Sequence, residues 1–236
     1  MLFPVVFTGL GLILLAVFLK FRVKQQRIKA VIMKSLVSMC FIASAISSLV
    51  KLIGSDNALF GAIITAGLIF GMLGDIWLDF KYIYRDDEYI FTISGFVVFA
   101  IGHILFNTAL AMKYLPQVSK ACVIIPVAFG IVCGVATFFG EKPMKVKYGR
   151  YKNISSVYCA IITSFVAFSI TLSFFTGFRH IELIVLNAAG IFFLISDLIL
   201  NGTYFGEGKD RPVDIITNHI TYYIAQFAIA FSLCLL

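Results

Sequence analysis

Long apolar stretches alternate with short polar segments along the whole chain of 236 residues. A helix needs about 20 mostly apolar residues to cross about 30 Å of hydrocarbon. The strands of a membrane barrel are about ten residues long and alternate in polarity, which these stretches do not. The pattern therefore predicts an all-α, polytopic membrane bundle with eight transmembrane helices, at residues 2–19, 31–50, 58–80, 89–112, 118–140, 154–176, 181–203 and 214–236.

The composition supports a membrane protein. Hydrophobic residues make up 61% of the chain and charged residues 13%, whereas a soluble domain is about 25% charged. This excludes an ordinary soluble enzyme, a disordered chain and a coiled coil. No linker interrupts the pattern, so we expect one integral domain over residues 1–236. The first stretch lacks a basic leader and a cleavage site, which favours a retained span over a signal peptide.

The basic residues lie in short runs between the apolar stretches, such as 20–29 and 142–152. Such runs orient a protein in the membrane and meet anionic head groups. Lys and Arg are concentrated in the odd-numbered loops, which predicts that these loops are cytoplasmic and both termini outside, in the cell membrane. We expect the lipid bilayer, and not nucleic acid, to be the partner of this charge.

Two pairs of short sequences are similar between the two halves of the chain. GDIWLD (74–79) resembles SDLILN (196–201), and GHI (102–104) resembles NHI (218–220). The pairs fall in the third and fourth, then the seventh and eighth stretches. They are compatible with a parallel four-plus-four pseudo-repeat, with chance similarity as the alternative.

Few carboxylates lie at membrane depth. At 1.5 Å per residue, Asp75 lies about 8 Å and Asp197 about 9 Å inside the cytoplasmic end of its predicted helix. An ionisable residue at depth is costly and is a functional candidate by default; the alternative is an interhelical hydrogen bond that serves packing alone. Asp79 shares a helix face with Asp75, and Asn201 shares one with Asp197, because each pair is four residues apart.

Other polar residues point to the same side of the membrane. Lys34 either snorkels to the head groups or pairs with an aspartate or a substrate phosphate. His103, with Asn107 one turn further on, is either a structural histidine or part of a site. A polar stripe on the last predicted helix must face the bundle interior rather than lipid. Its residues are Asn218, His219, Tyr222, Tyr223 and Gln226. Together these positions predict a polar cavity that opens towards the cytoplasmic leaflet and suits an amphiphile.

Two carboxylates in a poorly hydrated cavity can perform acid/base hydrolysis, since one can keep its proton while the other stays ionised. Signatures of several other membrane enzymes, such as HExxH, are absent from the sequence. A zinc site built from His103, His219 and the aspartates is an alternative, although these residues lack ligand spacing. We therefore assign no metal ligand and expect no cofactor.

Four motifs resemble the YhhN-type lysoplasmalogenase family in order and spacing: GDIWL (74–78), FAIGHILF (99–106), SDLIL (196–200) and YYIAQFAIAFS (222–232). The resemblance implies hydrolysis of the vinyl-ether bond of lysoplasmalogens, a class of lysophospholipid, to a fatty aldehyde and a glycerophospho-base. The two candidate catalytic acids of the family match Asp75 and Asp197, and its lysine matches Lys34. Ser35 stands where the family has proline, and Asp79 lies outside the general pattern.

Vinyl-ether hydrolysis begins with protonation of the β-carbon and passes through an oxocarbenium-like cation. Our hypothesis is that either Asp75 or Asp197 donates this proton while the other, ionised, stabilises the cation and guides water. A coupled pair shares its protons, so the sequence assigns neither role. Lys34 and the polar stripe would hold the head group, and His103 would hydrogen bond an aspartate.

Two other functions are compatible with the sequence. A small-solute or lipid transporter would also place polar groups near the middle of the membrane, but the outer half of this chain offers few ionisable residues. A zinc-dependent membrane lipid amidase or ester hydrolase would require His103 and His219 to bind metal.

Overall fold

The computed structural model describes residues 2–207 and 211–236, and within these ranges the secondary structure is helical apart from one isolated bridge between Val146 and Gly206. The all-α, polytopic prediction is confirmed. The α-helices are α1 (Leu2–Val23), α2 (Arg27–Leu52), α3 (Ala58–Phe80), α4 (Glu88–Tyr114), α5 (Ile124–Phe139), α6 (Glu141–Met144), α7 (Lys152–Phe175), α8 (Ile181–Phe205) and α9 (Pro212–Ser232). Short 3₁₀ helices are η1 (Arg85–Asp87), η2 (Leu115–Gln117), η3 (Lys120–Val123), η4 (Gly149–Tyr151) and η5 (Leu233–Leu235).

Seven helices among the described residues are long and apolar enough to cross a membrane, so the chain is a multi-pass membrane protein. The eighth predicted span, 214–236, corresponds to α9 and η5, and α9 is not one of these seven. Its polar side chains, including Asn218, His219 and Gln226, lower its hydropathy. The prediction of eight spans therefore exceeds by one the number that length and composition support.

Local sequence explains where several helices begin and end. Pro212 is the first residue of α9 and Pro126 lies in the first turn of α5, where a missing backbone N–H costs nothing. Gly177, at φ +65°, ends α7 in a Schellman motif. The backbone N–H of Gly177 bonds to the carbonyl of Phe174, and that of Phe178 to the carbonyl of Ser173.

The chain divides into two compact units. The first comprises residues 1–109 and 229–236, and the second comprises residues 110–228. The predictions of a single integral domain and of a four-plus-four repeat remain predictions.

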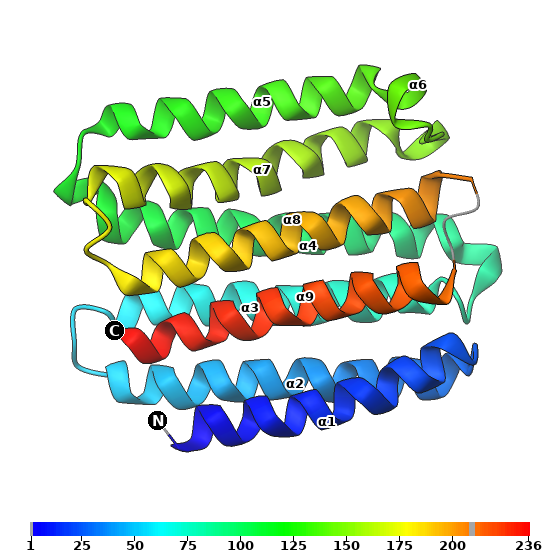
Figure 1. Ribbon diagram of the computed structural model, residues 1–236, viewed down its shortest axis with the longest axis horizontal. Helices are drawn as coiled ribbons and strands as arrows, with labels where there is room; N and C mark the ends of the chain where they lie inside the picture. Colours follow the sequence, from blue (N-terminus) through cyan, green and yellow to red (C-terminus); the bar gives the residue numbers. More distant parts are fainter. Residues whose placement is uncertain (1, 208–210) are drawn as a thin grey trace. The chain divides into compact units, whose positions relative to one another are not determined.

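Within the first unit, α1 packs along α2 and α2 packs along α3 (Figure 1). Glycines let α3 and α4 approach closely: a Cβ built on Gly102 would lie 3.0 Å from the backbone oxygen of Gly67. η5 packs on α2, where Ser48 Oγ lies 3.0 Å from Cys234 Sγ. Small residues at helix contacts are typical of packing in lipid, where van der Waals contact replaces the hydrophobic effect.

Within the second unit, α5 packs along α7, and α7 packs along α8 (Figure 1). Gly130 and Gly134 form a GxxxG motif on α5, and a Cβ on Gly130 would lie 2.5 Å from the carbonyl oxygen of Ala160. On α8, Gly190 lies against Val166 and Phe165. The helices of each unit are therefore in contact through their backbones as well as their side chains.

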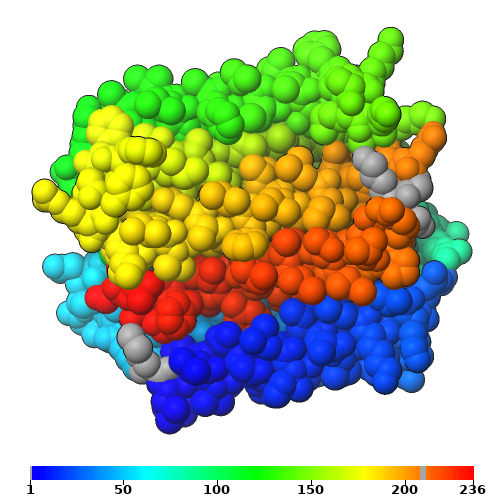
Figure 2. All heavy atoms as spheres, viewed as in Figure 1, coloured from blue at the N-terminus to red at the C-terminus, as the bar shows by residue number. Residues whose placement is uncertain are grey.

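Apolar side chains also cover outer surfaces of the helices. On α1, Leu12 is 55% and Ile13 66% exposed, and this helix, dark blue in Figure 2, forms part of the molecular surface. In water such exposure would be unfavourable. In a membrane protein these side chains face lipid.

Candidate functional site

The end of α1, the start of α2 and the end of α3 meet within the first unit. This follows from the connectivity, because α2 runs antiparallel to the helix before it and to the helix after it (Figure 1). Lys34 lies in the second turn of α2, and Asp75 and Asp79 lie in the last two turns of α3. The three residues that sequence depth and spacing selected therefore come together at one end of this unit.

Lys34 bridges the two aspartates. Its Nζ lies 3.1 Å from Asp75 Oδ1 and 3.3 Å from Asp79 Oδ1. All three residues are buried, with 5%, 2% and 1% of their respective surfaces exposed. Lys34 does not snorkel to the head groups; it serves as the charge partner of the carboxylates.

Two further residues complete this cluster. Ser38, one turn after Lys34 on α2, donates a hydrogen bond of 2.9 Å from Oγ to Asp75 Oδ2. Arg22, near the end of α1, forms an ion pair of 3.3 Å between Nη2 and Asp79 Oδ1. Each carboxylate oxygen of Asp75 thus has a donor, whereas Arg22 and Lys34 both approach Oδ1 of Asp79. We refer to Arg22, Lys34, Ser38, Asp75 and Asp79 as the Asp75 cluster.

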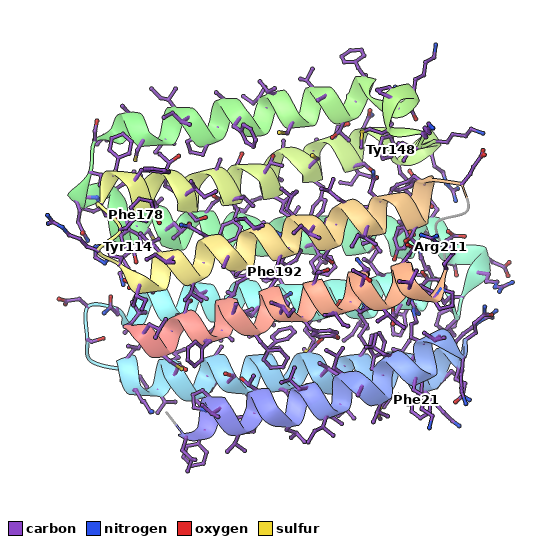
Figure 3. The ribbon with its side chains drawn as sticks, viewed as in Figure 1. Phe21, Tyr114, Tyr148, Phe178, Phe192 and Arg211 are labelled. Carbon is purple, nitrogen blue, oxygen red and sulfur yellow. The ribbon has the colours of Figure 1, made fainter. Side chains whose placement is uncertain are left out.

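Two basic side chains of this region, Arg22 and Lys81, lie against the ring of Tyr82. The Arg22 guanidinium lies 4.0 Å from the centre of the Tyr82 ring, and the Lys81 ammonium lies 5.0 Å from the same ring. Lys81 follows the last residue of α3 and is buried. Burial lowers the pKa of Lys81 to about 7, with Glu88 opposing the shift and Arg22 adding to it. Phe21, at this end of α1, is labelled in Figure 3.

His103 and Asn107 lie on α4 in the first unit. His103 is buried, and its Nδ1 donates a hydrogen bond of 2.9 Å to the carbonyl of Phe99. Asn107 Nδ2 donates one of 3.0 Å to the carbonyl of His103. These bonds run along α4 itself, and the bond from His103 to an aspartate remains a prediction.

Asp197 belongs to the second unit, on α8. The Tyr158 hydroxyl, on α7, donates a hydrogen bond of 2.6 Å to Asp197 Oδ2. Among the residues the structure describes, no lysine, arginine or histidine forms an ion pair with Asp197. The two predicted catalytic aspartates therefore differ in their immediate partners, a lysine and a serine for Asp75 and a tyrosine for Asp197.

The polar residues of α9 are largely buried, as the sequence predicts for a stripe that avoids lipid. Asn218 Nδ2 donates to the Ser196 carbonyl at 2.7 Å, which ties α9 to α8 next to Asp197. Gln226 Nε2 donates to the Tyr222 hydroxyl at 2.7 Å. His219 and Tyr223 are also buried.

Asn201 lies one turn after Asp197 on α8. Burial raises the pKa of Tyr148, and the nearby Asn201 side chain opposes the shift. The Tyr148 ring also packs against Phe205, with centroids 5.0 Å apart. The contact between Tyr148 and Phe205 thus joins the segment before α7 to the end of α8.

A second ionisable cluster, which the sequence did not predict, lies at the other end of the second unit. Figure 3 shows Tyr114 and Phe178 at one end of this unit and Arg211 at the other. Buried Glu182 Oε1 accepts a hydrogen bond of 2.8 Å from Tyr114, and lies 3.3 Å from Lys113 Nζ and from His180 Nδ1. The predicted outer side therefore carries more buried ionisable residues than the sequence indicates.

The sequence did not identify three of the residues that contact the aspartates. Arg22 lies in the basic run 20–29, which the sequence explains as a loop that orients the protein in the membrane. Ser38 is a serine, a common residue in membrane helices. Tyr158 lies in a largely apolar stretch, and the sequence does not show which residue of another helix its hydroxyl meets. The signal for Ser38 was its position four residues after Lys34, which places both on one face of α2.

Among residues 2–207 and 211–236, no three His, Cys, Asp or Glu side chains lie close enough together to hold a metal ion. The five cysteines are free thiols.

The model of the YhhN family matches residues 29–233. No curated protein and no solved structure matches the chain.

Proposed function

The chain belongs to the YhhN family, and from this premise we propose that it is a membrane hydrolase that cleaves the vinyl-ether bond of lysoplasmalogens. The products are a fatty aldehyde and a glycerophospho-base. The observation that carries the proposal is the buried Asp75 cluster, in which a carboxylate is held by Lys34 and Ser38 inside a membrane helix. A buried charge of this kind is costly and gains little for stability alone.

The different partners of the two aspartates favour different roles. The ammonium of Lys34, 3.1 Å from Asp75, balances a negative charge there. Asp75 is therefore the ionised carboxylate that stabilises a cationic intermediate. Asp197 has a neutral hydroxyl and no cation as its described partner, so its ionised form is less stabilised than that of Asp75, and we assign it the donation of the proton.

The proposed reaction balances as follows. A carboxylic acid transfers its proton to the β-carbon of the vinyl ether, and the double-bond electrons form the new C–H bond. The α-carbon becomes an oxocarbenium ion, which the ionised carboxylate stabilises and water attacks. Loss of a proton from this water gives a hemiacetal and restores the acid. Collapse of the hemiacetal breaks the C–O bond and yields the aldehyde and the glycerol hydroxyl.

The test uses purified protein and two lipids with the same head group, a lysoplasmalogen and its ester-linked 1-acyl counterpart. We expect aldehyde from the first and no fatty acid from the second. Hydrolysis in D₂O with immediate reduction of the product should place one deuterium on the carbon next to the former aldehyde carbon. No aldehyde from the lysoplasmalogen would contradict the proposal, and fatty acid from the ester would indicate an ester hydrolase.

We also propose that the protein resides in the cell membrane with both termini outside and the Asp75 cluster on the cytoplasmic side. The basic runs in the odd-numbered loops support this orientation. A C-terminal reporter that is active only in the cytoplasm should be silent. An active reporter would place the cluster at the outer leaflet.

A further inference from the structure

The two oxygens of Asp79 have unequal surroundings. Oδ1 takes both cations, Arg22 Nη2 and Lys34 Nζ, each at 3.3 Å. Oδ2 is buried and has no hydrogen-bond partner among the residues that the structure describes. A buried carboxylate oxygen without a donor is unfavourable, so a donor is expected when the site is occupied.

We propose that Asp79 is a specificity-determining residue whose Oδ2 accepts a hydrogen bond from the free sn-2 hydroxyl of the lysolipid. This inference rests on the proposed function, since it names the substrate group that the Asp75 cluster recognises. It gives Asp79 a role in substrate binding that the motif resemblance does not supply.

The spacing of the two aspartates favours the hydroxyl over the head group as the donor. Asp79 lies four residues after Asp75 on α3, a rise of about 6 Å. Asp75 stabilises the positive charge on the α-carbon, which is four bonds from the sn-2 hydroxyl oxygen, and an extended chain covers about 5 Å in four bonds. An ethanolamine nitrogen is ten bonds from the same carbon, more than twice that reach. A substrate with its vinyl ether near Asp75 therefore presents its hydroxyl at the level of Asp79.

The charges around Asp79 also favour a neutral donor. Two cations already approach Oδ1, and Lys81 lies beside Arg22 at the Tyr82 ring. A further cation at Oδ2 would be repelled by these neighbours. A hydroxyl supplies the missing proton without adding charge.

The experiment compares a lysoplasmalogen with its 2-deoxy analogue, which lacks the sn-2 hydroxyl. For the wild-type protein we expect kcat/KM to fall by about tenfold or more with the analogue, because a hydrogen bond to a charged group is lost. In Asp79→Asn the kcat/KM values for the two lipids should differ by no more than about threefold. Asp87→Asn removes an exposed carboxylate of η1 and should keep the wild-type ratio.

Two additional arms separate the alternatives. The first arm compares lysoplasmalogens with choline and ethanolamine head groups, since choline has no N–H donor. A lower kcat/KM with choline in the wild-type protein that disappears in Asp79→Asn would overturn the assignment to the hydroxyl. The second arm measures the binding affinity of the saturated 1-O-alkyl lysolipid and of its 2-deoxy form. Because these lipids are not hydrolysed, the comparison can also be made with a variant that has lost activity.

Equal rates for both lipids in the wild-type protein, or an unchanged ratio in Asp79→Asn, would overturn this inference and leave the proposed function intact. The first result would mean that something else, such as an ordered water, satisfies Oδ2. Absence of aldehyde from every lipid would overturn the proposed function and this inference with it.

Discussion

Lys34 and Asp75 form a buried ion pair, with 3.1 Å between Nζ and Oδ1, on two helices that are adjacent in the chain. The pair exists because α2 and α3 run antiparallel, so that the second turn of α2 faces the end of α3. Asp79, one turn later, accepts from the same ammonium. One lysine therefore neutralises parts of two carboxylates, and its removal should affect both.

Replacing Lys34 by methionine should be strongly destabilising. The change leaves two buried carboxylates with less compensation, and breaking a buried ion pair typically costs about 3–5 kcal/mol. Thermal unfolding in detergent micelles measures the effect, with Lys24→Met, in the exposed turn after α1, as the matched control. The double variant Lys34→Met/Asp75→Asn should regain part of the loss; a double variant less stable than Lys34→Met would contradict the pairing.

Tyr158→Phe removes the hydroxyl that donates to Asp197 at 2.6 Å. If Tyr158 positions Asp197, kcat should fall by about tenfold or more, because hydrogen bonds to acidic groups are among the stronger ones. KM should stay within about twofold, and the pH profile of kcat should shift because the environment of Asp197 changes. A variant with reduced stability but an unchanged kcat and pH profile would assign Tyr158 a purely structural role.

Close contact between α3 and α4 predicts a strict limit on side-chain size at Gly102. A Cβ there would lie 3.0 Å from the backbone oxygen of Gly67, and backbone cannot move aside cheaply. Gly102→Ala should therefore lower stability by about 1–3 kcal/mol. Gly9→Ala on α1, where a Cβ would have no heavy atom within 4 Å beyond the adjacent residues and the backbone of its own helix, should be neutral or slightly stabilising. Equal effects of both changes on the melting temperature would refute this packing.

Lys81 should make stability depend on pH. Its pKa in the folded protein is about 7, below its usual value of 10.5, because burial disfavours the charged form. Between these values the unfolded chain binds more protons, so stability should rise from pH 7 to pH 10. Lys81→Met should remove this part of the rise, which melting curves across the range can measure. Identical pH dependence in both proteins would show that Lys81 does not contribute.

The sequence predicted the positions of the helices well because membrane spans require long apolar stretches. The third predicted span, 58–80, has the same limits as α3. The fifth, 118–140, is shorter in the structure, since α5 begins at Ile124 after the short helix η3. The eighth, 214–236, corresponds in position to α9 and η5, but α9 is not among the seven candidate spans because its polar side chains reduce its hydropathy.

The sequence also identified the Asp75 cluster in part. Depth selected Asp75, and four-residue spacing added Asp79, because both are local properties of one helix. Arg22 and Tyr158 were missed since their partners lie on other helices, and only packing decides which residues meet. Lys113 and Glu182 lie at the ends of predicted spans, where the sequence does not distinguish a solvated charge from a buried pair.

The most direct test of the central claim is aldehyde release from a lysoplasmalogen by Asp75→Asn. Asparagine keeps the size of the side chain and removes the charge that we propose stabilises the cation. We predict that kcat falls by about a thousandfold, a loss typical of an essential electrostatic group, while the protein remains folded and Asp87→Asn retains full activity. Wild-type aldehyde release by Asp75→Asn would contradict the account.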